Sequence, residues 1–199
     1  MSRSCIILAG GKSVRLGRDK ILEKVGNSSL LENAISRVDS LVGEIIIVTA
    51  DERSFPQLEN NPKIRKVSDI YPGNGSLGGI HTGLAASNSY HNLVVAADMP
   101  FLNPSLLRYT FDVSDGFDFV LPRIDTFFEP LHAVYSRNCM EPAELIMKQG
   151  HKAIIGLFNY VKVRYVEAEE IDRFDPQRLS FFNINTQENL ELARKIAQE

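Results

Sequence analysis

Cysteine is scarce in this 199-residue chain. Cys5 and Cys139 are its only two cysteines, and they are too isolated to suggest a disulfide framework or a metal-binding knuckle. No apolar run approaches the roughly 20 residues that span a bilayer. The apolar stretch behind Arg3 is too short for the core of a signal peptide. We therefore expect a protein of the reducing cytoplasm that has no membrane partner.

The chain also lacks a strong excess of charge. Its formal net charge is −3, which argues against a broad surface for nucleic acid or anionic membrane but leaves room for a local basic site. Internal repeats, low-complexity tracts and linkers are absent from the sequence. With 44% hydrophobic and 24% charged residues, it has the composition of one α/β domain with a real core.

Two common phosphate-binding motifs are missing from the N-terminal region. A P-loop that ends at Gly11-Lys12-Ser13 would need glycine at position 6, where Ile6 stands. The dinucleotide fingerprint would need its second glycine at position 12, which is Lys12. The chain also has no Gly-x-Ser-x-Gly nucleophile elbow. P-loop, dinucleotide-binding and serine-nucleophile functions are therefore not indicated.

What the N-terminal region does contain is a short apolar run, Cys5–Leu8, which predicts a buried parallel strand followed by a glycine-rich loop. Paired glycines let the backbone turn sharply and bring its N–H groups close to an anion. The loop also carries four cations that can neutralise phosphate oxygens: Lys12, Arg15, Arg18 and Lys20. We interpret residues 8–20 as a phosphate-binding loop, against the alternative of a solvated basic turn.

The rest of the chain alternates between predicted strands and helices. Apolar runs predict strands over 44–49, 64–68, 92–97, 118–122, 131–135 and 161–166, and extended pieces over 21–25 and 181–185. Helices are expected from Ser29, which forms a capping box with Glu32, and also over 80–85, from Pro104, over 142–149 and 153–159, and after Thr186. The pattern predicts an α/β fold of three layers, α/β/α, with a mostly parallel, Rossmann-like sheet.

Polar groups follow four of the predicted strands. They are the Gly10-Gly11 loop, Thr49, Asp69 and Asp98. Since the carboxyl ends of parallel strands meet at one sheet edge, these groups can converge. Backbone donors, cations and carboxylates together suit a triphosphate with Mg²⁺, a metal that takes one or two carboxylates plus phosphates. Asp98 is the expected metal ligand, with a turn or helix-capping aspartate as the alternative.

The loop Leu-Ala-Gly-Gly-Lys-Ser-Val-Arg-Leu-Gly-Arg-Asp-Lys resembles that of the molybdenum cofactor guanylyltransferases. These enzymes belong to the nucleotidyltransferases of the nucleotide-diphospho-sugar transferase type. Residues 75–80 and 97–101 are similar to the family's Gly-Pro-Leu-Ala-Gly-Ile and Cys-Asp-Met-Pro-Phe segments, and 130–135 and 183–186 to segments on its cofactor side. The resemblance covers most of the chain.

The resemblance implies a Mg²⁺-dependent transfer of GMP from GTP to the terminal phosphate of molybdopterin or Mo-molybdopterin, with release of pyrophosphate. The chain as a whole predicts one domain, whose residues 1 to about 116 bind the nucleotide and whose residues from about 117 to 199 supply the acceptor side. Partner proteins that deliver molybdopterin or accept the product are compatible with this role. The implied nucleotide contacts are Leu8, Ala9, Gly10, Gly11, Lys20, Thr49, Asp69, Gly75, Gly78, Gly79 and Asp98. The implied catalytic groups are Arg15, Lys20 and Asp98, and the implied pterin-side residues are His132, Asn183 and Asn185.

Departures from the family pattern leave alternatives open. Ser76 replaces a proline, and Thr49 stands where some members carry an asparagine at the guanine pocket. A cytidylyltransferase of the same cofactor, a sugar-phosphate nucleotidyltransferase and a non-catalytic GTP-binding module of the pathway therefore stay in view. As a strand histidine, His132 is more often a core or rim residue, and Asn185 suits a capping role as well as a metal partner.

Overall fold

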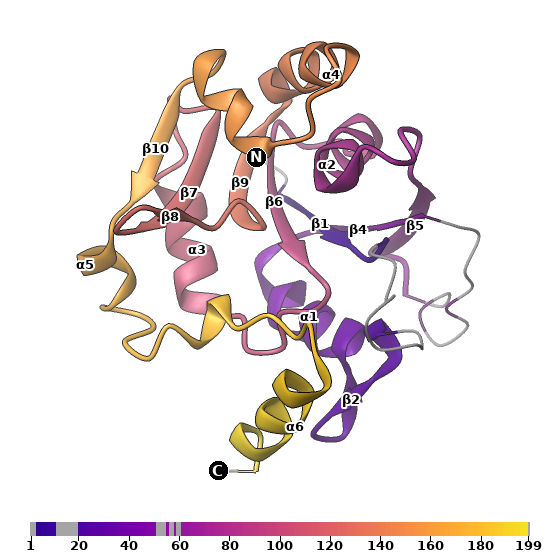
Figure 1. Ribbon diagram of the computed structural model, residues 1–199, viewed down its shortest axis with the longest axis vertical. Coiled ribbons are helices and arrows are strands. Elements are labelled where there is room, and N and C mark those ends of the chain that lie inside the picture. Colours follow the sequence, from indigo (N-terminus) through magenta and orange to yellow (C-terminus); the bar gives the residue numbers. More distant parts are fainter. Residues whose placement is uncertain (1–2, 11–19, 51–54, 56–57, 59–60, 199) are drawn as a thin grey trace.

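The computed structural model describes residues 3–10, 20–50, 55, 58 and 61–198. Its central sheet has the strand order β10-β7-β9-β6-β1-β4-β5 (Figure 1). The first strand, β1 (Ser4–Leu8), pairs in parallel with β4 (Glu44–Thr49) and with β6 (His91–Ala96), and β4 pairs in parallel with β5 (Ile64–Ser68). Within these described residues, no helix is long and apolar enough to cross a membrane.

The other half of the sheet contains one reversed inner strand. β9 (His132–Ser136) is antiparallel to both of its neighbours, β6 and β7 (Phe119–Ile124). β10 (Val163–Val166) pairs in parallel with β7, and the short β8 (Phe127–Phe128) folds back on β7 as a hairpin. The sheet is therefore mostly parallel, as the sequence predicts.

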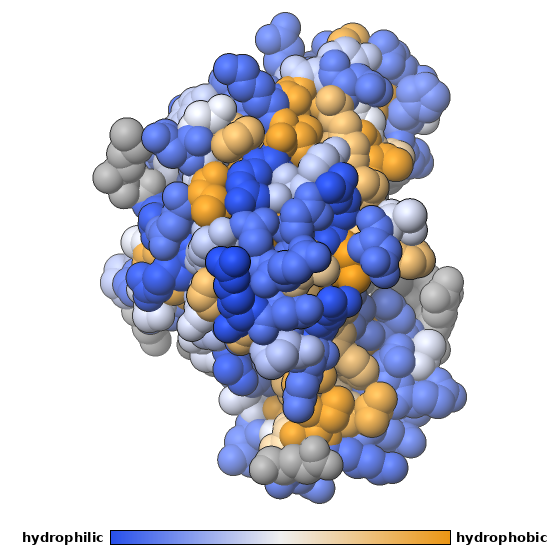
Figure 2. Space-filling model, turned by 90° about the vertical axis from the view of Figure 1, so that its left-hand side faces the viewer, coloured by the Kyte–Doolittle hydropathy of each residue, from blue (hydrophilic) through white to orange (hydrophobic). Residues whose placement is uncertain are grey.

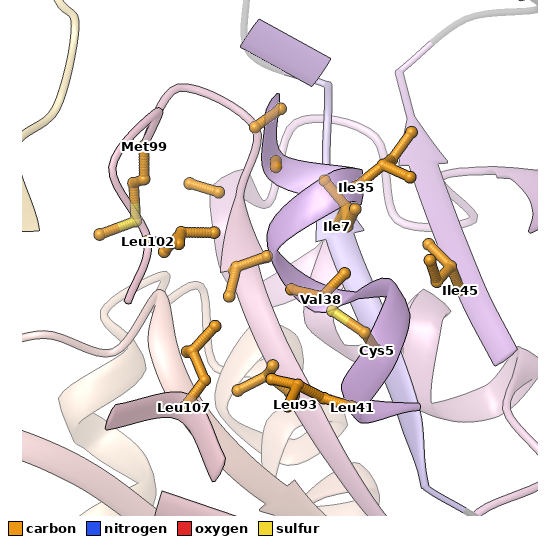
Figure 3. Close-up of a cluster of buried hydrophobic side chains, with 14 of the residues drawn as sticks. Cys5, Ile7, Ile35, Val38, Leu41, Ile45, Leu93, Met99, Leu102 and Leu107 are labelled. Atoms are coloured by element: carbon orange, nitrogen blue, oxygen red, sulfur yellow. The ribbon is translucent and has the colours of Figure 1, made fainter. Parts of the chain in front are cut away.

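Helices cover both faces of this sheet because successive side chains of a strand point to opposite faces. Cys5 and Ile7 pack with α1 (Leu30–Val38) and α3 (Pro104–Asp112), and Figure 3 shows this cluster. Ile6 points the other way, into the cluster formed with α2 (Gly75–Ala86) and α4 (Met140–Lys148). The three-layer α/β/α architecture is confirmed.

A separate small cluster attaches the C-terminal helix. α6 (Gln187–Ile196) packs over the two-stranded hairpin of β2 (Lys24–Val25) and β3 (Ser28–Ser29), through the apolar side chains of Val25, Leu30, Ile184, Leu190 and Ala193. The Thr186 side chain accepts from the Asn189 N–H, which confirms the predicted cap. The Ile184 N–H donates to the Asp98 carbonyl at 3.0 Å, so the C-terminal segment is fastened to the end of β6.

Several element boundaries differ from the sequence predictions. Residues 20–22 form a 3₁₀ turn, η1 (Lys20–Leu22), where an extended piece is predicted, and the helix predicted over 153–159 is also 3₁₀, η5 (Ile154–Asn159). α2 starts at Gly75 and not near Ile80, because glycines of low helix propensity are used there for close packing. The remaining turns and short helices are η2 (Asp39–Leu41), η4 (Arg137–Cys139), α5 (Ala168–Ile171) and η6 (Leu179–Phe181).

The surface beyond β10 is largely hydrophilic, with smaller apolar areas toward its two ends (Figure 2). Ion pairs on this side join the strands to α5 and the residue before it. Arg164 pairs with Glu170 at 2.6 Å, and Arg123 pairs with Glu167 at 2.5 Å. The site described next lies at the carboxyl edge of the parallel strands.

Candidate active site

A pocket of about 670 Å³ opens at the carboxyl ends of β1, β4 and β5 and the start of α2. Backbone hydrogen bonds hold its floor together, with Ala9 N donating to Val48 O and Asp69 N donating to Thr49 O, both at 2.8 Å. The pocket is lined by Leu8, Gly10, Val48, Thr49, Ala50, Asp69, Pro72, Gly73, Gly75, Ser76 and Gly79. The structure thus brings together six of the residues predicted to bind the nucleotide: Leu8, Gly10, Thr49, Asp69, Gly75 and Gly79.

Glycine is required at several points of this wall. A Cβ on Gly10 would lie 3.1 Å from the Ala50 backbone nitrogen, and a Cβ on Gly79 would lie 3.1 Å from Leu8 Cδ2. Gly75 has φ +60°, a backbone conformation that side chains disfavour. Gly78 does not line the pocket but lets α2 pack closely against the preceding turn, because a Cβ added there would lie 2.8 Å from the Tyr71 carbonyl oxygen.

Asp69 is the acidic group of the pocket, and two partners orient it. Its Oδ1 accepts from the Tyr71 backbone N–H at 2.9 Å, and the Thr82 hydroxyl of α2 lies 2.9 Å from the same oxygen. A carboxylate bonding to the N–H two residues ahead is an Asx turn, which the sequence could have suggested. Thr82 could not have been found locally, because it lies 13 positions along the chain. Asp69 also lines the pocket, so this oriented carboxylate is available to a ligand there.

The second part of the site is a cluster of Lys20, Asp98 and Asn185, which we call the cation corner. Lys20 Nζ donates to Asp98 Oδ2 at 2.6 Å and to Asn185 Oδ1 at 3.0 Å. The Lys20 and Asp98 side chains are only 14% and 22% exposed. Asp98 Oδ1 is buried and accepts no hydrogen bond from the residues that the structure describes. A buried carboxylate oxygen without a partner is costly unless a cation or donor satisfies it.

These oxygens fit a hard divalent cation. Asp98 offers a carboxylate and Asn185 an amide oxygen, which are ligand types that Mg²⁺ takes alongside substrate phosphates. No cluster of three or more His, Cys, Asp or Glu side chains occurs among the described residues, so an all-protein metal cage is not found there. The donor set therefore suits a metal that arrives with a phosphate-bearing ligand.

The structure favours the core alternative for His132 over a place on the pterin side. Its side chain is 0% exposed, its ring lies edge-on to Phe181 with centroids 5.0 Å apart, and neither ring nitrogen has a hydrogen-bond partner in the described part of the chain. Burial lowers the pKa of His132 to about 4. It is therefore a core residue in this structure, packed against Phe181.

The other predicted residues are distributed as follows. Asn183 donates from Nδ2 to the Phe181 carbonyl at 3.1 Å and is half-buried. Ala9 is buried beside the pocket and does not line it. Gly11 and Arg15 lie outside the described residues, as do the weaker candidates Lys12 and Arg18.

Comparisons with known proteins agree with this architecture. Residues 5–163 match the family model of the MobA-like NTP transferase domain. The chain belongs to this family. It is 38% identical to the probable molybdenum cofactor guanylyltransferase of Methanosarcina mazei, over 95% of this chain and 88% of that protein. It is 35% identical to the corresponding protein of Pelotomaculum thermopropionicum, over 97% of this chain and 92% of that one.

Solved structures extend the comparison to three dimensions. Molybdopterin-guanine dinucleotide biosynthesis protein A from Archaeoglobus fulgidus superposes with a TM-score of 0.84 at 28% identity, covering 98% of each chain. A 2-C-methyl-D-erythritol 4-phosphate cytidylyltransferase from Thermus thermophilus shares the fold at 16% identity, with a TM-score of 0.74 and 100% of both chains covered. The resemblance seen in the sequence is confirmed, and with it the nucleotide-diphospho-sugar transferase type of fold.

Proposed function

We propose that this member of the MobA-like NTP transferase family transfers GMP from GTP to the terminal phosphate of molybdopterin, and releases pyrophosphate. The observation that carries the proposal is the position of the cation corner at the same sheet edge as a glycine-lined pocket. The names of the relatives, which are molybdenum cofactor guanylyltransferases, support the choice of base and acceptor.

The pocket is proposed to hold the nucleoside. Leu8 and Val48 offer apolar contacts for the base, and the Asp69 carboxylate can accept from the N–H donors on the edge of guanine. Gly75 and Ser76 bring the start of α2 to the pocket, where the first N–H groups of a helix have no intrahelical partner. These donors suit a carbonyl or an anionic oxygen of the ligand.

The transfer itself needs no protein nucleophile. An oxygen of the acceptor phosphate forms a bond to the α-phosphorus of GTP, and the bond to the bridging oxygen breaks with its electron pair on pyrophosphate. Lys20 and Arg15 are proposed to bind the charge on the departing pyrophosphate, a role that suits lysine and arginine. Asp98 and Asn185 would hold a bound Mg²⁺, which would neutralise phosphate charge when present.

The two parts of the chain are proposed to divide the substrates within one nucleotidyltransferase domain. Residues 1–116 would bind GTP, and residues 117–199 would shape the side on which molybdopterin enters. The placement of Asn185 beside Lys20 supports this division, since it brings the C-terminal segment to the phosphate side of the pocket. Proteins that deliver molybdopterin or accept the product would approach from that side.

Transfer assays with each nucleoside triphosphate test this proposal. Purified protein is incubated with molybdopterin, Mg²⁺ and GTP, ATP, CTP or UTP, and the dinucleotide product and pyrophosphate are quantified. Of the four nucleoside triphosphates, GTP is expected to be the one that yields product. Selectivity for CTP would point to the cytidylyltransferase alternative, and GTP binding without pyrophosphate release would indicate a non-catalytic module; either result would overturn the proposal.

A further inference from the structure

The Lys20 ammonium occupies the point where two oxygen ligands converge. One oxygen belongs to Asp98, which follows β6 in the chain, and lies 2.6 Å from Nζ. The other belongs to Asn185, which precedes α6, and lies 3.0 Å from Nζ. The Lys20 side chain is 14% exposed, which makes it more buried than that of Asp98. An ammonium so placed is bound to two oxygens and is not a solvated surface charge.

A divalent metal at Asp98 would need the same space and the same oxygens. Mg²⁺ prefers carboxylate and amide oxygens and bonds to them at about 2.1 Å, closer than an ammonium hydrogen bond. Two cations on one carboxylate repel each other, and partial burial weakens the screening of that repulsion by water. The metal and the ammonium are therefore competitors for this corner.

Lysine can leave such a position at small structural cost. Its charge sits on a flexible four-carbon stem, so Nζ can move from one group of oxygens to another while the backbone stays in place. Triphosphate oxygens bound near Gly10 would offer Lys20 an alternative set of acceptors. Asp98, which holds Lys20, follows β6 at the same sheet edge where Gly10 follows β1, and the Ala97 N–H donates to the Leu8 carbonyl at 3.0 Å.

We propose that Lys20 is a tethered cation that fills the metal position while no nucleotide is bound, and that nucleotide phosphates draw it away. The consequence is an order of binding in which the divalent metal enters with the nucleotide and binds weakly by itself. Before nucleotide arrives, Lys20 neutralises Asp98, whose second oxygen is buried and unpartnered among the described residues. This inference rests on the proposed metal role of Asp98 and is independent of which base or acceptor is used.

The test is a titration with Mn²⁺ alone, followed through the electron paramagnetic resonance signal of the free ion. Lys20→Met should bind Mn²⁺ at least about tenfold more tightly than the unaltered protein. Asp98→Asn should show no such site, and the matched control Lys24→Met, which removes a nearby exposed lysine, should behave as the unaltered protein. An unchanged or weaker Mn²⁺ affinity in Lys20→Met would overturn the inference.

A second arm begins with the unaltered protein, whose own result already tests the proposed order. With GTP present, the protein should bind more Mn²⁺ than the sum of what protein alone and GTP alone bind at the same concentrations. This excess should be smaller in Lys20→Met or, should that variant fail to fold, in Lys20→Gln. Metal binding that is equally tight before nucleotide is added would contradict the proposed order. The Mn²⁺-only arm contains neither nucleotide nor acceptor. If the protein does not transfer GMP, the Mn²⁺ titration still tests the role of Lys20. If the Mn²⁺ affinity of Lys20→Met is unchanged, the role of Lys20 is refuted and the proposed selectivity for GTP is unaffected.

Discussion

The two halves of the site are built in different ways. The nucleotide pocket is formed mainly by backbone and glycine, from strand ends that are hydrogen-bonded neighbours in one sheet. The cation corner is formed by charged and polar side chains, and its partners are 78 and 165 positions apart in the chain. The pocket should therefore be sensitive to added volume, whereas the corner should be sensitive to lost charge.

The largest effect is expected from removing charge at the corner. Asp98→Asn keeps the shape of the side chain and should lower kcat by at least about 100-fold, because charge stabilisation of this kind is worth that much in a reacting site. Thermal unfolding should change little, since the side chain is partly exposed and its backbone carbonyl still accepts from Ile184. Normal turnover in this variant would show that Asp98 does not hold the metal.

The next effect concerns the core beneath the acceptor side. His132 has its pKa lowered to about 4, below the usual 6.5, so the unfolded chain binds a proton more readily than the folded one. Stability should be full above about pH 6.5 and should be lost as the pH falls toward 4, by about 3 kcal/mol in total. Urea unfolding at pH 7 and pH 5 measures the difference.

A matched pair of variants checks the origin of this acid sensitivity. His132→Leu should flatten the dependence between pH 7 and pH 5, because a buried histidine with no hydrogen-bond partner among the described residues can be replaced by an apolar side chain. His151→Gln, at an exposed histidine, should leave the dependence unchanged. An acid sensitivity that survives in His132→Leu would assign it to other groups.

Two glycines of α2 separate the effects of volume on the pocket and on the core. Gly79→Ala would place a methyl group on the pocket wall and should weaken GTP binding roughly tenfold. Gly83→Ala would place a methyl group in steric overlap with Ile6 Cγ2 and should lower the free energy of unfolding by about 1–3 kcal/mol, with GTP affinity kept. Calorimetry of binding and urea unfolding measure both quantities. Equal effects of the two variants on GTP affinity would contradict the assigned pocket.

The smallest effect is expected from the partner of Asp69. Thr82→Val removes the hydroxyl 2.9 Å from the Asp69 carboxylate and should raise the Kd of GTP about fivefold, in line with about 1 kcal/mol for one hydrogen bond. Thr110→Val serves as the control, because its hydroxyl bonds within α3 to Leu106 O and lies away from the pocket. A loss of GTP affinity in both variants would show that the effect is one of general destabilisation.

Local signals in the sequence predicted much of the fold. The predicted strand over 44–49 is β4 itself, and the Ser29–Glu32 capping box and Pro104 lie at helix starts as expected. These features depend on residues that are close in sequence, so pattern and propensity are enough to find them. The direction of β9 could not be predicted, because an apolar run has the same alternation in a parallel and in an antiparallel strand.

The parts of the site that could be predicted are those formed by residues close to one another in the sequence. Leu8, Gly10 and Gly79 follow from glycine-rich segments next to strands, and they do line the pocket. The meeting of Lys20 with Asn185 depends on how α6 packs on the β2–β3 hairpin, which no local pattern encodes. The choice between a core and a pterin-side His132 could not be made locally for the same reason, since the Phe181 ring packed against it comes from a distant turn.

The most direct measurement compares the affinities of guanosine and of GTP with Mg²⁺ for the unaltered protein and for Asp98→Asn. Guanosine can use only the pocket, whereas GTP with metal uses both halves of the site. The structure predicts that Asp98→Asn weakens GTP with Mg²⁺ and leaves guanosine binding unchanged. An equal loss for both ligands, or no loss for GTP, would contradict the division of the site into a nucleoside pocket and a cation corner.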